Sequence, residues 1–364
     1  MVRMARAAVF EGVNKPFVMR EYPVRPPEAG EVLVKVSMST ICRSDIHTWE
    51  GKRRNPCPSI LGHEIIGVID AIGSGIDRDL RGEKLREGDR ITWTEFFSCG
   101  ECYYCRILNL PQKCTGLRKY GHDPADRPPH LTGGFAEYCY VLPGTGLVLL
   151  PEGLSDDEAT PINCGGASMV AMTEAGGIGV GDTVVIQGLG MLGLTGVALA
   201  RARGAVRVIG LDAVEARLRM AERLGADLTF DVSAMEPEVL VNCVRDACPP
   251  DGADVVIEVC GLPAVISQGL DMLRKGGRYV IGGLAYPSDQ VAIDWHKFFY
   301  RNISIIGSAN YHPKHLVQAV DFFASNRNVL PLKDLVDGHF PLENLTAAFE
   351  KAASHQVLRA GIVP

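Results

Sequence analysis

The chain has 364 residues, 46% hydrophobic and 22% charged, which is typical of a globular protein with about two domains. A net charge of −6 without a Lys/Arg run excludes a nucleic-acid-binding surface. No apolar run approaches the ~18 residues of a membrane span, and the N-terminus turns polar too soon for a signal peptide, so we expect a cytoplasmic protein without a membrane partner.

The first part of the chain, about residues 5–155, reads as short strands separated by Pro- and Gly-rich turns. Several strands alternate apolar and polar residues, for example 5–10, 31–38 and 134–141. This alternation indicates a partly open antiparallel barrel.

Four potential metal ligands, Cys42, His47, His63 and Glu64, lie in a short N-terminal stretch, with the hydroxyl of Ser44 close to the first thiol. Zinc takes thiolate, imidazole and carboxylate ligands, and a catalytic site leaves one position open. A cation there would polarise a bound alcohol oxygen, and Ser44 and His47 would carry the proton away. The alternative is a buried thiol beside ordinary histidines.

Four further cysteines, Cys99, Cys102, Cys105 and Cys114, crowd into one Gly-containing loop. In a reducing compartment such clustering points to metal rather than disulfides. Four thiolates form a closed, structural zinc site. An iron–sulfur cluster or a disulfide pair are the alternatives.

After residue 150 strands alternate with helices, which predicts βαβ units on a parallel sheet. Gly188, Gly190 and Gly193 follow the strand 183–187 and open a helix, and Asp212 closes the next strand. This order is typical of dinucleotide binding, with the pyrophosphate at the helix N-terminus. Asp212 would bind the ribose hydroxyls and repel a 2′-phosphate, which favours NAD over NADP, although nearby Arg217 weakens that preference.

With these motifs in this order, the chain resembles the zinc-containing medium-chain alcohol dehydrogenases over essentially its full length. The resemblance rests on G-H-E at 62–64, the cysteine quartet, G-G-F-A-E-Y at 133–138 and G-L-G-M-L-G at 188–193. It implies an α/β protein with a GroES-like, partly open β-barrel catalytic domain, residues 1–162 and 309–364. An inserted Rossmann domain with a doubly wound parallel sheet, residues 163–308, would bind NAD.

The resemblance implies that Cys42, His63 and Cys164 bind a catalytic zinc, the first of two zinc ions per chain. Glu64 resembles the nearby carboxylate that can approach the metal. Asp45 resembles the residue that orients His63, a role that ligating imidazoles commonly need.

The resemblance also assigns a proton relay to Ser44 and His47, and contacts with the cofactor pyrophosphate to Arg43 and Arg359. The residues expected to bind NAD are therefore Arg43, Gly188, Gly190, Met191, Leu192, Gly193, Asp212, Arg217 and Arg359.

The reaction that we expect from the resemblance is reversible oxidation of an alcohol, with a secondary alcohol as the expected substrate, to a ketone or aldehyde. The expected assembly is a homodimer or homotetramer. The run 111–122 resembles a bacterial branch associated with phosphonate catabolism. Trp93 and Glu95 are candidates for the wall of the substrate pocket, whereas His122, His130, His296, His312 and His315 lack ligand spacing. The alternatives are a polyol, sugar-alcohol or amino-alcohol dehydrogenase, or a zinc-bearing binding protein without activity.

Overall fold

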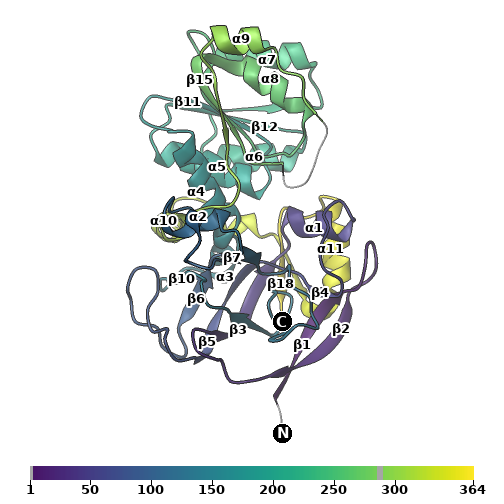
Figure 1. The fold of residues 1–364 in the computed structure, drawn as a ribbon. Coiled ribbons are helices and arrows are strands. Elements are labelled where there is room, and N and C mark those ends of the chain that lie inside the picture. The colour runs from purple at the N-terminus through teal and green to yellow at the C-terminus, as the bar shows by residue number, and fades with distance from the viewer. Residues whose placement is uncertain (1–2, 285–289) are drawn as a thin grey trace. The chain divides into compact units, whose positions relative to one another are not determined.

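The computed structural model describes residues 3–284 and 290–364. The chain forms two compact units, the first Met1–Ala167 with Tyr311–Pro364 and the second Ser168–Asn310 (Figure 1). The expected boundaries, 162/163 and 308/309, lie a few residues before these divisions. As a result Cys164, expected at the start of the Rossmann domain, belongs to the first unit.

The first unit is built mainly from antiparallel strands. Strand order in its largest sheet is β10-β6-β5-β3-β18-β17, with β9 paired to β3, and a second sheet has the order β2-β1-β4. β3 pairs with β9 at one end and with β18 at the other, so the sheet divides at β3. Within the described residues this strand path stays open, in agreement with the expected partly open barrel. The strands are β1 (Arg3–Phe10), β2 (Val18–Val24), β3 (Val32–Thr40), β4 (Ser59–Ile60), β5 (Glu64–Ile72), β6 (Arg90–Trp93), β7 (Phe96–Phe97), β8 (Arg118–Lys119), β9 (Tyr138–Val141), β10 (Leu147–Leu149), β17 (Gly338–Pro341) and β18 (Ala360–Val363).

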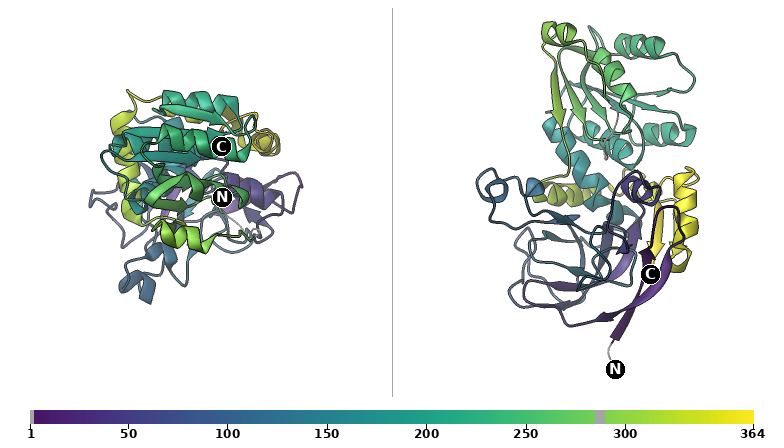
Figure 2. Two further views of the ribbon diagram at one scale, coloured as in Figure 1. Left: turned by 90° about the horizontal axis from the view of Figure 1, so that it is seen from above. Right: turned by 45° about the vertical axis from the view of Figure 1, so that its right-hand side comes forward.

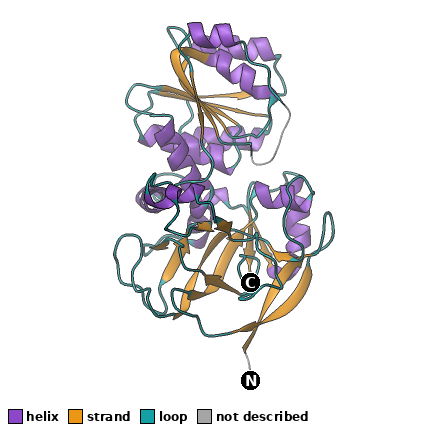
Figure 3. Ribbon diagram, in the orientation of Figure 1, coloured by secondary structure: helices purple, strands orange, loops and turns teal. Residues whose placement is uncertain are grey.

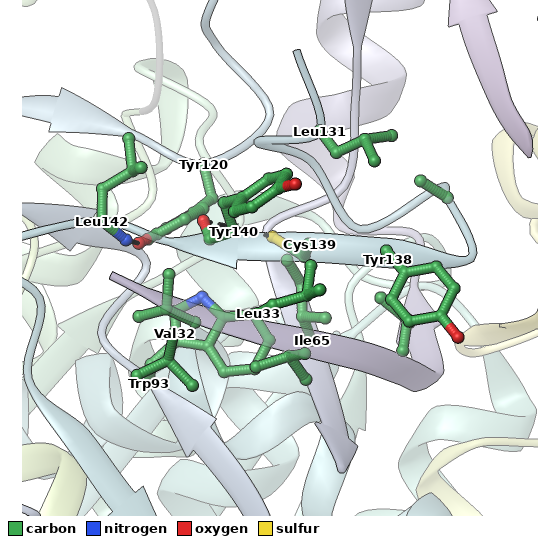
Figure 4. Close-up of a cluster of buried hydrophobic side chains, with 14 of the residues drawn as sticks. Val32, Leu33, Ile65, Trp93, Tyr120, Leu131, Tyr138, Cys139, Tyr140 and Leu142 are labelled. Carbon is green, nitrogen blue, oxygen red and sulfur yellow. Dashed lines mark hydrogen bonds between the residues drawn. The ribbon is translucent and has the colours of Figure 1, made fainter. Parts of the chain in front are cut away.

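A cluster of large apolar side chains fills the interior of this unit (Figure 4). Trp93, Tyr120 and Tyr140 are fully buried in it, and the rings of Trp93 and Tyr120 meet edge to face with centroids 6.0 Å apart. Such pairs add stability beyond their burial. Trp93, a candidate for the pocket wall, therefore contributes its side chain to the core.

Short helices connect and cover the strands of the first unit (Figure 3). α1 begins after Cys42, where the Asp45 carboxylate accepts a hydrogen bond from the Cys42 N–H at 2.9 Å. This cap satisfies an otherwise unpaired N–H and fixes the backbone that carries Cys42. The helices are α1 (Arg43–Trp49), α2 (Tyr103–Arg106), η1 (Pro111–Lys113), α3 (Asp156–Ala159), η2 (Thr160–Asn163), α10 (Pro313–Asn326), η3 (Leu332–Leu335), η4 (Leu342–Asn344) and α11 (Leu345–Ala353); α4 (Gly165–Ala175) begins in this unit and ends in the next.

The second unit is a six-stranded parallel sheet with helices on both faces (Figure 2). Its order, β13-β12-β11-β14-β15-β16, is the 3-2-1-4-5-6 order of a dinucleotide-binding domain. All five residues of β11 are buried, as expected for a central strand covered on both faces. The elements are β11 (Thr183–Gln187), α5 (Met191–Ala202), β12 (Arg207–Asp212), α6 (Glu215–Arg223), β13 (Leu228–Asp231), α7 (Pro237–Ala247), β14 (Ala253–Glu258), α8 (Ala264–Met272), β15 (Leu273–Ile281), α9 (Trp295–Tyr300) and β16 (Ser304–Gly307).

Candidate functional site

Four buried side chains from three separate segments of the first unit converge on one point. One ligand atom from each of Cys42, His63, Glu64 and Cys164 lies within 4.8 Å of the others. Cys42 caps α1, His63 and Glu64 stand at the start of β5, and Cys164 follows η2. Two thiols, an imidazole and a carboxylate, all withdrawn from water, fit a zinc ion. Hydrogen bonding with Cys164 and His63 lowers the pKa of Cys42 well below its ordinary value although burial opposes it, which favours the thiolate that a metal requires.

The orientation of His63 leaves one ring nitrogen for a metal. Its Nδ1 lies 3.3 Å from Asp45 Oδ1, a distance that suits an ion pair although the angles miss those of a hydrogen bond. Burial alone would lower the pKa of His63, but Asp45 and Cys42 raise it well above the ordinary value. With Nδ1 beside Asp45, Nε2 is the nitrogen left for a metal, in the arrangement by which a carboxylate commonly orients a metal-binding imidazole.

Glu64 is wholly buried beside Arg359. The Arg359 Nη2 lies 3.5 Å from Glu64 Oε1, Arg359 Nη1 donates to the Ile41 carbonyl at 2.8 Å, and Thr40 donates to the other Glu64 oxygen. Burial raises the pKa of Glu64 to about 8 even though Arg359 opposes that shift. Arg359, which we expected at the cofactor pyrophosphate, is thus engaged inside the first unit next to the metal ligands.

The two predicted relay residues lie on one face of α1, one turn apart. Ser44 Oγ is 3.4 Å from His63 Nε2, and His47 Nδ1 is 3.8 Å from Glu50. Burial, followed by the charge of Arg43, lowers the pKa of His47. A neutral imidazole can accept a proton, so this direction of the pKa shift is compatible with the role of His47, which stays a prediction.

Sequence reasoning missed the amide that ties the ligand-bearing segments together. Asn163 Nδ2 donates to the carbonyls of His63 and Trp93, both at 2.9 Å, and Tyr311 donates its hydroxyl to the Asn163 carbonyl. Asn163 is fully buried and directly precedes Cys164. Its only signal in the sequence is this position next to a predicted ligand.

Glu95, the other candidate for the pocket wall, lies next to the ring of His63, with partners that sequence reasoning missed. Glu95 Oε1 accepts from Lys119 Nζ at 3.0 Å, and Glu95 Oε2 lies 3.9 Å from His63 Nε2. Burial would raise the pKa of Glu95, but Lys119 and His63 lower it, so Glu95 is a carboxylate. His122, which we predicted to have no site role, lies with its ring centroid 5.9 Å from that of His63.

The cysteine quartet forms a second cluster in the first unit. Sγ–Sγ distances are 3.4 Å for Cys99–Cys114, 3.5 Å for Cys102–Cys105 and 3.9 Å for Cys102–Cys114. Four sulfurs at the usual 2.3 Å from a tetrahedral zinc would stand about 3.8 Å apart, so the cluster fits that ion. Hydrogen bonds from the Thr115 and Cys105 backbone lower the pKa of Cys102 to about 5. All four cysteines are free thiols rather than disulfides.

The glycine motif in the second unit joins β11 to α5. Gly188 has φ +95°, and a Cβ at Gly193 would lie 1.8 Å from the Gly188 carbonyl oxygen, so both positions require glycine. Among the described atoms, nothing lies within 4 Å of a Cβ built at Gly190, which leaves room for a phosphate at the start of α5, where Met191 and Leu192 follow.

Asp212 ends β12 and faces this loop. Its carboxylate accepts from the Leu189 N–H at 2.7 Å and the Val214 N–H at 2.9 Å, and Arg217 Nη1 lies 3.7 Å away. The expected arrangement of strand, glycine turn, helix and acidic residue is therefore present.

The fold and the two cysteine-containing clusters define a zinc-binding dehydrogenase with a separate nucleotide-binding unit. The chain belongs to the zinc-containing medium-chain alcohol dehydrogenase family: residues 28–152 match the family described as "Alcohol dehydrogenase GroES-like domain", and residues 192–325 match "Zinc-binding dehydrogenase". It is an oxidoreductase family that uses zinc and a nicotinamide cofactor.

Particular relatives place the chain among enzymes with different substrates. The chain is 30% identical to 5-exo-hydroxycamphor dehydrogenase of Pseudomonas putida over 96% of each chain. It is also 30% identical to a sorbitol dehydrogenase of Halalkalibacterium halodurans, again over 96% of each. An alcohol dehydrogenase structure from Thermotoga maritima has a TM-score of 0.94 and 32% identity, with full coverage of both chains.

Two further solved structures bear on the cofactor. A zinc-binding dehydrogenase from Sinorhizobium meliloti 1021, bound to NADP, has a TM-score of 0.87 and 28% identity over both whole chains. An alcohol dehydrogenase from E. coli CFT073, in complex with NADH, has a TM-score of 0.85 and 25% identity over 99% of each chain. These relatives do not bear on the phosphonate-associated branch, which stays a prediction.

No helix in residues 3–284 or 290–364 is long and apolar enough to cross a membrane.

Proposed function

We propose that the protein oxidises an alcohol reversibly to a ketone or aldehyde by transfer of a hydride to NAD. The observation that carries this proposal is the buried cluster of Cys42, His63 and Cys164, with Glu64 beside it. Bound there, zinc would polarise the hydroxyl oxygen of the substrate and lower its proton affinity. The carbinol carbon loses a hydride to the nicotinamide, and the hydroxyl loses a proton to the relay.

The relay that we propose starts at Ser44, whose Oγ lies near the Nε2 of His63. Because His47 stands three residues later on α1, its ring lies on the same helical face and can take the proton onward. Asp45 holds His63 in the tautomer that leaves Nε2 as the ligand atom.

The preference for NAD is supported by Asp212. A carboxylate at the end of β12 can accept from ribose hydroxyls, whereas it would repel a 2′-phosphate. Arg217, 3.7 Å away, already has this acidic partner. The second zinc of the proposal belongs to the cysteine quartet, where it would cross-link the loop that carries Cys99 and Cys114.

Replacement of one ligand tests this proposal. Cys42→Ala is expected to reduce NAD-dependent turnover by more than about 1,000-fold, while NAD binding, measured by calorimetry, stays near the wild-type value. Cys139→Ala is the matched control because Cys139 is a buried free thiol of the same unit that lies in the barrel core. Wild-type turnover in Cys42→Ala would contradict the proposal.

A further inference from the structure

Glu95 offers one carboxylate oxygen toward the metal-binding side of His63. Lys119 binds Oε1, whereas Oε2 lies 3.9 Å from His63 Nε2, the nitrogen left for a metal. Ser44 Oγ lies 3.4 Å from the same nitrogen. A carboxylate can only accept hydrogen bonds, so a molecule seated here would have to present a donor to Glu95.

The hydrogen bonds of Asn55 fix a second acceptor beside His63. Asn55 Nδ2 donates to Ser59 Oγ at 2.8 Å and to the Gly121 carbonyl at 3.3 Å, so its Oδ1 is an acceptor. His122 Nδ1 lies 2.7 Å from that oxygen and must carry the proton. In the neutral imidazole, this tautomer leaves the other ring nitrogen, Nε2, as an acceptor as well.

The charges around these acceptors select among donors. Lys119, 3.0 Å from Glu95, balances the charge of that carboxylate. An ammonium group would add a second cation beside Lys119, whereas a hydroxyl donates to Glu95 or His122 without adding charge. The surroundings therefore favour a neutral donor.

Building on the proposed function, we propose that Glu95 and His122 form a subsite for a second hydroxyl, and that the substrate is an alcohol with hydroxyls on neighbouring carbons. Glu95 Oε2 lies only 3.9 Å from His63 Nε2, so a group that donates to it stands close to a hydroxyl held at the metal, on a neighbouring carbon rather than on a remote one. Glu95 and His122 thus determine specificity, and Lys119 and Asn55 position them.

Three alcohols with one carbon skeleton test this subsite: 2-butanol, 2,3-butanediol and 3-amino-2-butanol. The kcat/KM of zinc-loaded enzyme is measured for each with both NAD and NADP. The kcat/KM for the diol is expected to exceed that for 2-butanol by roughly 10- to 100-fold, because only the diol supplies a second hydroxyl that donates to the buried carboxylate. Glu95→Gln, which replaces the free oxygen with an amide, is expected to reduce this ratio at least about tenfold. The same substitution should also raise kcat/KM for 2-butanol.

Two further variants separate the subsite from general damage to the fold. His122→Phe keeps a ring but removes the acceptor, and it should lower the diol ratio independently of Glu95→Gln. Glu31→Gln is the matched control, because Glu31 is a buried carboxylate of the same unit paired with Arg25 at 2.7 Å and lies outside the site. It should keep the wild-type ratio.

The shift in unfolding temperature on adding each alcohol provides a readout without turnover, because a ligand stabilises the state that it binds. The diol should stabilise wild type more than it stabilises Glu95→Gln. Equal ratios in wild type and both site variants, or preference for the amino alcohol, would overturn the subsite. If wild type oxidises none of the three, the proposed function fails; the subsite then stands only if the diol-specific stabilisation remains, and falls if it is absent.

Discussion

Asn163→Ala is expected to destabilise the candidate zinc site, although Asn163 is not one of the expected zinc ligands. The Asn163 side chain donates two hydrogen bonds of 2.9 Å, to the carbonyls of His63 and Trp93, at a fully buried position. Each bond contributes about 1 kcal/mol, and each carbonyl that loses its donor in the interior adds a desolvation cost. The free energy of unfolding should therefore fall by about 3 kcal/mol.

For a unit of this size, that loss lowers the unfolding temperature by roughly 6–12 °C. Because Asn163 links the segments of His63 and Cys164, we also expect the affinity for the catalytic zinc to fall about 10- to 100-fold, as for residues that orient ligands. Thermal unfolding followed by circular dichroism and competition with a zinc chelator measure the two effects.

Asn326→Ala serves as the control, since Asn326 Nδ2 makes a single bond of 2.8 Å to the Phe322 carbonyl within α10. It should cost about 1 kcal/mol or less and leave zinc affinity unchanged. The reasoning would be refuted if Asn163→Ala unfolded and bound zinc as the wild type does.

Three other predictions concern the rest of the molecule. Cys105→Ser should reduce bound zinc from two ions to one per chain by elemental analysis; two ions in the variant would contradict a four-thiolate site. Gly193→Ala should abolish nucleotide binding in calorimetry or unfold the second unit, because its Cβ would meet a backbone oxygen at 1.8 Å. Asp254 accepts from Thr183 and Arg274, which lower its pKa although burial opposes them. Its folded pKa is depressed, so its contribution is present above the ordinary value of 3.8 and is lost as the pH falls below that value. Asp254→Asn should therefore be about 1 kcal/mol less stable than wild type at neutral pH, with a gap that closes in acid; a gap that widens in acid denaturation curves would disprove this sign.

The sequence predicted the architecture because its signals are local. Strand–helix alternation after residue 150 and the turn at Gly188 each depend on neighbouring residues, and both features are present. The convergence of Cys42, His63 and Cys164 depends on the tertiary fold, and only the family resemblance brought Cys164 into the predicted set.

The residues around the site could not be predicted from the sequence, for a physical reason. Asn163 and His122 have roles set by partners far along the chain, and an amide or a single histidine carries no spacing signal. Trp93 and Glu95 are close neighbours in sequence, yet Trp93 packs in the core while Glu95 lies near His63. Whether a side chain enters the core or the site is decided by the turn between β6 and β7, which composition does not reveal.

The central claim, zinc-dependent oxidation of an alcohol by NAD, is tested most directly by NADH formation in three samples of one preparation. These are untreated protein, chelator-treated protein and chelator-treated protein with zinc restored, each assayed with 2,3-butanediol and 2-butanol. We predict that chelation removes turnover and that zinc returns it, with NAD used in preference to NADP. Turnover that persists in protein shown by elemental analysis to be free of zinc would contradict the account.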